Sequence, residues 1–177
     1  GHNTDVAGIV RALAEAGVTA AEQALVLGGG ATACSAVAAL AQLGATRAQV
    51  VVRSPQRAQD VVTTGKHVGV SVELVAWGDA ASVGSASGLV VSTVPASAAT
   101  QAVDVLKPLG APGLLLDVVY DPWPTPVARA WERRGGTSVG GFPMLLHQAV
   151  EQVRLMTGRT PDVDAMRHAG LAALSER

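Results

Sequence analysis

A glycine-rich segment has the composition of a phosphate-binding turn. Gly28, Gly30 and Ala33 follow the spacing G-x-G-x-x-A, between a short apolar run and an alanine-rich segment. Glycines at these positions allow a tight turn and a close approach of the backbone to a pyrophosphate, and the start of the next helix offers free N–H groups to the anion. A purely structural turn is the alternative. Because the match falls between a predicted strand and a predicted helix, we expect dinucleotide binding.

Positive charge follows the second predicted strand. NAD sites place an acid there, which accepts hydrogen bonds from the ribose 2′-hydroxyl. This sequence has Arg53, Ser54 and Arg57 instead. Guanidinium groups form charge-assisted, often bidentate hydrogen bonds with a phosphate, and a serine hydroxyl can donate one more. Solvated arginines on a loop are the alternative, but the spacing from the glycine segment favours NADP(H) as the cofactor.

Alternating strands and helices must position these residues. Short β-branched runs that are apolar on both faces are typical of buried parallel strands, and helical segments that mostly end at glycine lie between them. We therefore predict an α/β fold with a Rossmann-like, doubly wound and mostly parallel sheet. The predicted strands are residues 24–28, 49–53, 70–75, 89–93 and 114–119, and the helices between them are residues 31–44, 54–65 and 96–110.

Further helices flank this alternation. Residues 3–17 are predicted as an amphipathic helix that is capped by Thr4 or Asp5 and ends at Gly17. Residues 142–158 and 162–177 are predicted as two more helices. The 177 residues are enough for one substantial core, so we expect a single domain.

Composition narrows the class of protein. The net charge of −1 and the aromatic content of 3% argue against nucleic acid or an anionic membrane as a partner. Cys34 is the only cysteine, which excludes an internal disulfide and a multi-cysteine metal site and fits a reducing cytoplasm. The apolar runs are too short to span a bilayer, and no histidine pair has metal-ligand spacing with a carboxylate. We expect a cytoplasmic protein without a metal.

Five segments resemble motifs of the shikimate dehydrogenase family, and they occur in the family's order over essentially the whole chain. "NTDVAG" resembles N-T-D-x-x-G, "GGGATA" the glycine loop, and "VRSPQR" the N-R-T-x-x-R motif. "DVVYDPWPTP" is similar to D-x-x-Y-x-P-x-x-T-P, and "GGFPMLLHQA" to G-x-x-M-L-x-x-Q. The matched region is the family's C-terminal, NADP-binding portion.

The resemblance implies a reversible, NADPH-dependent reduction of 3-dehydroshikimate to shikimate in aromatic amino-acid biosynthesis. It assigns Asp5 to the aspartate that works beside a catalytic lysine, and Tyr120 and Gln148 to substrate contacts. It also places the helices of residues 1–17 and 142–177 along the cleft between two domains. The cofactor-binding residues it implies are Gly28, Gly29, Gly30, Ala31, Arg53, Ser54, Arg57, Ser92, Thr93, Val94, Gly141 and Met144.

The family's pattern is not fully kept. Val52 replaces the usual Asn of the arginine motif, Pro143 replaces a glycine, and "STVP" at residues 92–95 stands for N-A-T-P.

Ketone reduction needs a cation or proton donor at the carbonyl oxygen, and the family uses a lysine there. Lys66 and Lys107 are the only lysines, and we place both on loops away from the cleft. The chain also starts at Gly1 without a methionine, so we expect a fragment without the family's N-terminal substrate domain, poorly active or inactive alone.

Plainer interpretations stand beside these assignments. Asp5 could serve only as a helix cap, Tyr120 could pack against the sheet, and Gln148 could be an exposed helix residue. His147 is interpreted as structural, and Cys34 as a small packing residue.

Two other functions remain open from the sequence. One is a quinate/shikimate dehydrogenase that prefers NAD, for which an acid in place of Arg53 would have been the signal. The other is a non-catalytic NADP-binding regulatory module. A homodimer is left open as the assembly.

Overall fold

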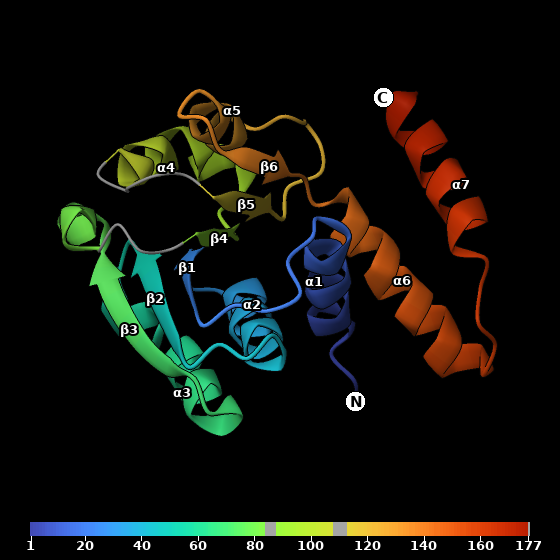
Figure 1. Ribbon diagram of the computed structural model, residues 1–177, viewed down its shortest axis with the longest axis horizontal. Helices are drawn as coiled ribbons and strands as arrows, with labels where there is room; N and C mark the ends of the chain where they lie inside the picture. Colours follow the sequence, from blue (N-terminus) through green and yellow to red (C-terminus); the bar gives the residue numbers. More distant parts are fainter. Residues whose placement is uncertain (84–87, 108–112, 177) are drawn as a thin grey trace.

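The computed structural model contains one six-stranded sheet in which all neighbouring strands run parallel (Figure 1). It describes residues 1–83, 88–107 and 113–176. The strand order is β3-β2-β1-β4-β5-β6, so the chain reverses direction across the sheet between β1 and β4. The predicted α/β, Rossmann-like fold is confirmed. The strands are β1 (Gln23–Leu27), β2 (Arg47–Val52), β3 (Ser71–Ala76), β4 (Leu89–Ser92), β5 (Leu114–Asp117) and β6 (Thr137–Val139).

Helices cover both faces of the sheet and form two apolar layers. On one face, α1, α2 and α3 pack together, and α6 packs along α1. On the other face, α4 and α5 pack against each other, and the side chain of Trp131 in α5 is fully buried in this layer. Helix α7 lies at the edge, against α6 (Figure 1). The helices are α1 (Thr4–Glu15), α2 (Ala31–Gln42), α3 (Gln59–Val68), α4 (Ala99–Leu106), α5 (Pro126–Glu132), α6 (Phe142–Thr157) and α7 (Val163–Ser175).

The central strands are buried on both faces, as the apolar runs predicted. All four residues of β4 and of β5 are buried, and β1 is buried from its second residue onward. In the described part of the chain, no helix combines the length and the apolar character needed to cross a membrane.

Two elements were not predicted. Helix α5 begins with the hydroxyl of Thr125 as its cap and with Pro126 in its first turn, a combination that marks a helix start. Strand β6 has three residues and only partly buried side chains, so it leaves little periodic signal. The predicted helix of residues 96–110 is observed as a 3₁₀ turn followed by α4, and its last three residues fall outside the described ranges.

Two local predictions were wrong. The cap of α1 is Asn3, whose side chain accepts a hydrogen bond from the Asp5 amide, rather than Thr4 or Asp5. The helix α3 continues past Gly65 to Val68 and ends at Gly69, which has the left-handed φ of 79°. Gly65 is there for close packing, because a Cβ would lie 2.5 Å from the Val72 side chain. Lys66 and His67 therefore belong to a helix rather than a loop.

Candidate functional site

The glycine loop joins β1 to α2 at the carboxyl edge of the sheet. Gly28 has φ of 106°, and a Cβ there would collide with the hydroxyl of Thr93 at the end of β4. A Cβ at Gly29 would lie 2.8 Å from the side chains of Val52 and Ala58. These two glycines therefore let the loop run tightly between β2 and β4, at the point where the strand order reverses, which is where open α/β sheets bind ligands.

Gly30 differs from its neighbours because a Cβ there would have no atom within 4 Å. It occupies the N-cap position of α2 and has no side chain to cap the helix. The first turn of α2 therefore presents backbone N–H groups toward open space, and the helix dipole favours an anion there. Ala33, the last residue of the glycine motif, is fully buried, which lets α2 pack on the sheet.

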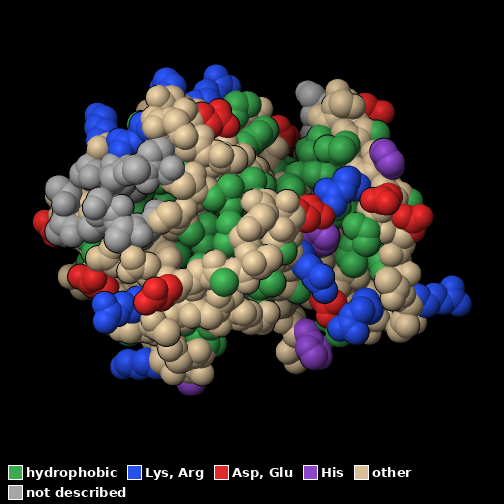
Figure 2. Space-filling model, viewed as in Figure 1, with side chains coloured by type: hydrophobic (Ala, Val, Ile, Leu, Met, Phe, Trp, Pro, Cys, Tyr) green, Lys and Arg blue, Asp and Glu red, His purple; other side chains and the backbone are tan. Residues whose placement is uncertain are grey.

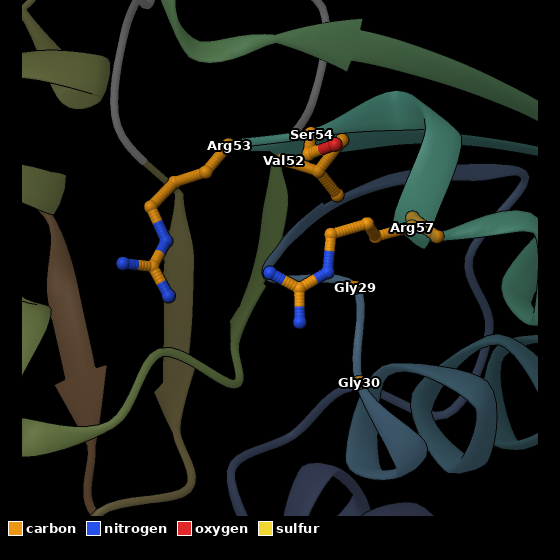
Figure 3. A pocket seen from close by; sticks show the side chains of 7 residues that line it. Gly29, Gly30, Val52, Arg53, Ser54 and Arg57 are labelled. Carbon is orange, nitrogen blue, oxygen red and sulfur yellow. The ribbon is translucent and has the colours of Figure 1, made fainter.

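The two predicted arginines line a cavity of about 510 Å³ beside this loop (Figure 3). Arg53 follows β2, and Arg57 ends a short 3₁₀ turn (Pro55–Arg57). In Figure 3 the Arg57 side chain points toward Gly29, whereas Arg53 extends along the other side of the cavity. Both side chains are exposed, and within the described ranges neither has an acidic partner or a hydrogen bond. The full cavity lining is Gly29, Gly30, Val52, Arg53, Ser54, Arg57 and Ala58.

Ser54 sits at the same cavity, but its hydroxyl donates a 3.1 Å hydrogen bond to the amide oxygen of Gln56. A hydroxyl has a single proton, so Ser54 would have to release Gln56 before it could donate to a ligand. Among the side chains that line the cavity, the two arginines therefore supply the free hydrogen-bond donors.

A second pocket of about 250 Å³ adjoins the first. The two share Gly29, Gly30 and Arg53, so they form one continuous groove over the carboxyl ends of the strands. Its other lining residues are Gly28, Trp77, Thr93, Val94, Pro95 and Ala98. Trp77, Pro95 and Ala98 were not among the predicted site residues.

Three predicted cofactor-binding residues, Ser92, Thr93 and Val94, lie at or just after the end of β4. The hydroxyl and the amide of Thr93 donate hydrogen bonds of 2.9 and 2.8 Å to the Leu27 carbonyl oxygen, which hold Thr93 in place. Ser92 is fully buried, and Val94 is 3% exposed. Ser92 therefore supports the groove from beneath, and a ligand would meet this segment through Thr93 and the Val94 surface that lines the second pocket.

A buried polar network anchors the segment that carries Tyr120. Asp117, at the end of β5, accepts hydrogen bonds from the Thr125 hydroxyl at 2.6 Å and from the Val119 amide at 3.3 Å. Burial raises the pKa of Asp117, while the hydrogen bonds from Thr125 and Val119 act in the opposite direction. The network ties both ends of the segment to the sheet, although sequence reasoning had not assigned Asp117 or Thr125 a role.

Tyr120 is 38% exposed and faces a hollow of about 330 Å³ between the loop after β5 and helix α7. Figure 2 shows hydrophobic side chains gathered beside the upper part of α7, where this hollow lies. Gly141 holds the start of α6 against the Tyr120 segment: its amide donates to Val119 over 3.0 Å, and a Cβ would collide with the Val118 carbonyl. Met144, one turn later, is almost fully buried. The lining of the hollow is Tyr120, Asp121, Trp123, Gly140, Phe142, Pro143, Leu171 and Leu174.

Asp5 and Gln148 lie on the facing helices α1 and α6, and both are half-buried. These helices approach closely at Gly8, where a Cβ would lie 2.6 Å from the Met144 carbonyl oxygen and 3.3 Å from Gln148 Cβ. One turn earlier, Thr4 accepts a 3.1 Å hydrogen bond from Gln152. The structure therefore brings the helix that carries Asp5 against the helix that carries Gln148.

Asn3 links Asp5 to the cofactor side of the molecule. Its oxygen caps α1 through the Asp5 amide at 3.0 Å, and its nitrogen donates to Ser35 of α2 at 2.9 Å. Ser35 itself donates to the Ala31 carbonyl at the start of α2. The backbone of Asp5 is thus fixed relative to the helix that follows the glycine loop.

Four further residues considered in the sequence, the two lysines, His147 and Cys34, do not line either pocket of the groove. Lys66 lies in the last turn of α3, and Lys107 pairs with Asp104 at 2.6 Å. His147 contacts Glu15 at 2.8 Å, which supports its structural interpretation. Cys34 is half-buried against the apolar layer of α1, α2 and α3. In the described ranges, no group of three or more His, Cys, Asp or Glu side chains could hold a metal ion.

Comparison with known proteins finds similarity to shikimate dehydrogenases. A family model described as the shikimate 5′-dehydrogenase C-terminal domain matches residues 141–169. Shikimate dehydrogenase (NADP(+)) of Rubrobacter xylanophilus is 38% identical over 96% of this chain. The chain is therefore similar to shikimate dehydrogenases over nearly its whole length. It spans 61% of that relative's length, so its residues correspond to part of a longer enzyme.

Solved structures of the shikimate dehydrogenase family have the same fold. The shikimate dehydrogenase of Mycobacterium tuberculosis is 43% identical with a TM-score of 0.81, over 97% of this chain and 62% of that one. A quinate dehydrogenase of Corynebacterium glutamicum, solved in complex with NAD, is 29% identical with a TM-score of 0.80, over 97% of this chain and 63% of that one. Proteins similar to this chain are therefore described with NADP(+) in one case and with NAD in another.

Proposed function

We propose that this chain is the NADP(H)-binding portion of a shikimate dehydrogenase, which interconverts 3-dehydroshikimate and shikimate reversibly in aromatic amino-acid biosynthesis. The observation that carries the proposal is the pair of guanidinium groups, from Arg53 and Arg57, that line one cavity beside the glycine loop without acidic partners in the described chain. A 2′-phosphate would neutralise both charges, whereas a ribose hydroxyl would not.

The groove fits the remainder of a dinucleotide. Gly28, Gly29 and Gly30, with the first turn of α2, would hold the pyrophosphate through backbone N–H groups. Thr93, Gly141 and Met144 are proposed for the nicotinamide side. The bound cofactor would supply the hydride, and this chain would orient it.

The proposed catalytic role of this chain rests on α1 and α6. The Asp5 carboxyl would take part in proton transfer at the reacting oxygen of the substrate, beside the family's lysine. Gln148 and Tyr120 would donate hydrogen bonds to substrate hydroxyls. The family's lysine has no counterpart in Lys66 or Lys107, which lie on α3 and at the end of α4. We therefore propose that turnover needs the part of the longer relatives that this chain does not span, with residues 1–17 and 142–177 bordering the shared cleft.

Titration of the chain with NADPH and NADH tests the cofactor assignment. We expect NADPH to bind at least about tenfold more tightly, because hydrogen bonds to charged groups contribute about 1.5–3 kcal/mol each. Arg53→Ala and Arg57→Ala should each weaken NADPH more than NADH. Arg47→Ala is the matched control, because Arg47 is exposed at the opposite end of β2. Equal binding of both cofactors, unchanged by either substitution, would contradict the assignment and leave the NAD-preferring alternative.

Activity measurements test the proposal that turnover needs the part of the longer relatives that this chain does not span. We expect the chain alone to reduce 3-dehydroshikimate with NADPH poorly or not at all, and to gain activity when the remaining part of a family member is supplied. Turnover at ordinary enzyme rates by the chain alone would refute the need for that part. Cofactor binding without activity after the addition would favour a regulatory NADP-binding module.

A further inference from the structure

Trp77 occupies a defined place at the carboxyl edge of the sheet. In the register of β2 and β3, Val52 pairs with Ala76, the last residue of β3. Arg53 and Trp77 are the next residues of the two strands, and both line the 250 Å³ pocket of the groove. In the strand order β3-β2-β1, Trp77 therefore follows the strand on the far side of β2 from the glycine loop, although Trp77 and the loop line the same pocket.

The part of Trp77 that faces the pocket is apolar. The residue is half-buried and packs against the layer formed by α4 and α5. Its indole nitrogen is out of reach of solvent and has no hydrogen-bond partner among the described residues. Since the nitrogen is the only polar atom of the side chain, the surface that remains accessible consists of ring carbons.

The rest of this pocket fits a flat, mostly apolar group. Val94, Pro95 and Ala98 face it from the segment after β4, and Arg53 contributes a planar cation. A phosphate gains nothing from indole carbons, because its oxygens need N–H or O–H donors. A purine gains from both an aromatic ring and a guanidinium plane, since each presents a face on which a base can stack.

We propose that Trp77 forms one wall of an adenine subsite. The part of the 250 Å³ pocket lined by Trp77, Pro95 and Ala98 takes the base, the part lined by the glycine loop is left to the pyrophosphate, and the 510 Å³ cavity takes the 2′-phosphate. This inference rests on the proposed binding of NADP(H). The ribose joins base and 2′-phosphate directly, so a phosphate between Arg53 and Arg57 leaves the base beside Arg53, where Trp77 stands. Trp77 thus contributes affinity for the adenosine half of the cofactor, whereas Arg57 contributes selectivity for its phosphate.

Calorimetric titration with adenosine 2′,5′-bisphosphate, NADPH and NADH tests the division of roles. Trp77→Ala should weaken all three ligands by a similar factor of about 5 to 100, the range measured when aromatic rings that stack on bases are removed. Trp77→Phe should recover most of the affinity. Arg57→Ala should weaken the bisphosphate and NADPH but not NADH. Trp123→Ala is the matched control, because Trp123 lines a different hollow, near α7, and should leave bisphosphate binding unchanged.

Fluorescence gives a reading that does not depend on the stability of the alanine variant. The bisphosphate should change the tryptophan emission of the wild type, and the change should be lost in Trp77→Phe while binding persists. Suppose that the wild type binds the bisphosphate and that Arg57→Ala weakens this binding. If Trp77→Ala then binds the bisphosphate as tightly as the wild type, and the ligand does not change the tryptophan emission of the wild type, the adenine assignment is wrong and the NADP(H) proposal stands. If the wild type binds neither the bisphosphate nor NADPH, both proposals are overturned.

Discussion

The hydroxyl of Thr125 donates a 2.6 Å hydrogen bond to the carboxylate of Asp117, although eight residues separate the two in the sequence. The same hydroxyl oxygen accepts a 3.0 Å hydrogen bond from the Ala128 amide and so caps α5. Asp117 is 1% exposed, and Thr125 is equally buried. One hydroxyl therefore joins the end of β5 to the start of α5 and closes the loop that carries Tyr120.

Thr125→Ala should lower the free energy of unfolding by about 2–4 kcal/mol, because it removes a helix cap and leaves a buried carboxyl group short of a partner. Urea denaturation measures the change. Thr64→Ala is the control, because its hydroxyl bonds only to the Asp60 carbonyl on an exposed helix face, and we expect less than about 0.5 kcal/mol there. An equal loss in both variants would show that the Asp117–Thr125 bond contributes little.

Glu15 should make stability depend on pH in the acid range. Partial burial acts to raise its pKa, but hydrogen bonds from Arg167 and His147 hold the pKa below the ordinary carboxyl value. A lowered folded-state pKa stabilises the fold above the unfolded value of about 4.3, and this contribution is lost as pH falls through the folded value. The stability difference between wild type and Glu15→Gln should therefore be present at pH 7 and should shrink as the pH falls below the unfolded value.

Urea denaturation of both proteins at several pH values measures this difference. We expect it to stay below about 1 kcal/mol at pH 7, because the Glu15 side chain is 40% exposed and solvent screens the pair. Comparison with Glu15→Gln removes the contribution of Asp117, whose raised pKa changes stability in the opposite direction. A difference that is constant from pH 7 to pH 3 would exclude the carboxylate as its source.

The glycines of the loop should respond differently to alanine. Gly28→Ala should destabilise the fold by about 1–3 kcal/mol, because it combines a left-handed φ with a collision against Thr93. Gly30→Ala should leave the melting temperature nearly unchanged, since its Cβ meets open space, yet should weaken NADPH binding because that space belongs to the groove. Normal NADPH affinity in Gly30→Ala would place the pyrophosphate elsewhere.

Gly8→Ala should separate α1 from α6. The new Cβ would lie 2.6 Å from the Met144 carbonyl oxygen, so the helices must move apart, at a cost of about 1–3 kcal/mol. Chemical denaturation measures the loss, and Gly78→Ala is the control, because a Cβ at Gly78 meets no atom within 4 Å. Unchanged stability in Gly8→Ala would show that α1 and α6 are not held at this distance in solution.

The sequence predicted five of the six strands and the helices between them because their signals are local. Apolar runs such as residues 24–28 and 89–93 allow few alternatives, and the glycines mark the ends of helices. The missed elements are short: β6 has three residues, and α5 has seven, although Thr125 and Pro126 mark its start. Strand β6 is short and half-exposed, and the start of α5 follows the Trp123–Pro124 segment, where residues before proline disfavour helix.

The candidate site residues likewise fall into those with local sequence signals and those without. The glycine loop and the arginines could be predicted because a turn and a charge are properties of short segments. Trp77, Asp117 and Thr125 could not, because their roles depend on the pairing of β2 with β3 and on a bond across eight residues. The missed cap of α1, Asn3, is also held by a hydrogen bond to Ser35 of another helix, a contact that the local sequence does not reveal.

Arg53 borders both compartments of the groove, whereas Arg57 borders the larger one alone. Redesign of the protein toward the unphosphorylated coenzyme should therefore begin at Arg57, where a charge can be removed or reversed while the neighbouring compartment keeps its shape. Exchange of Arg53 would alter how the whole ligand is seated, so selectivity and overall affinity would change together.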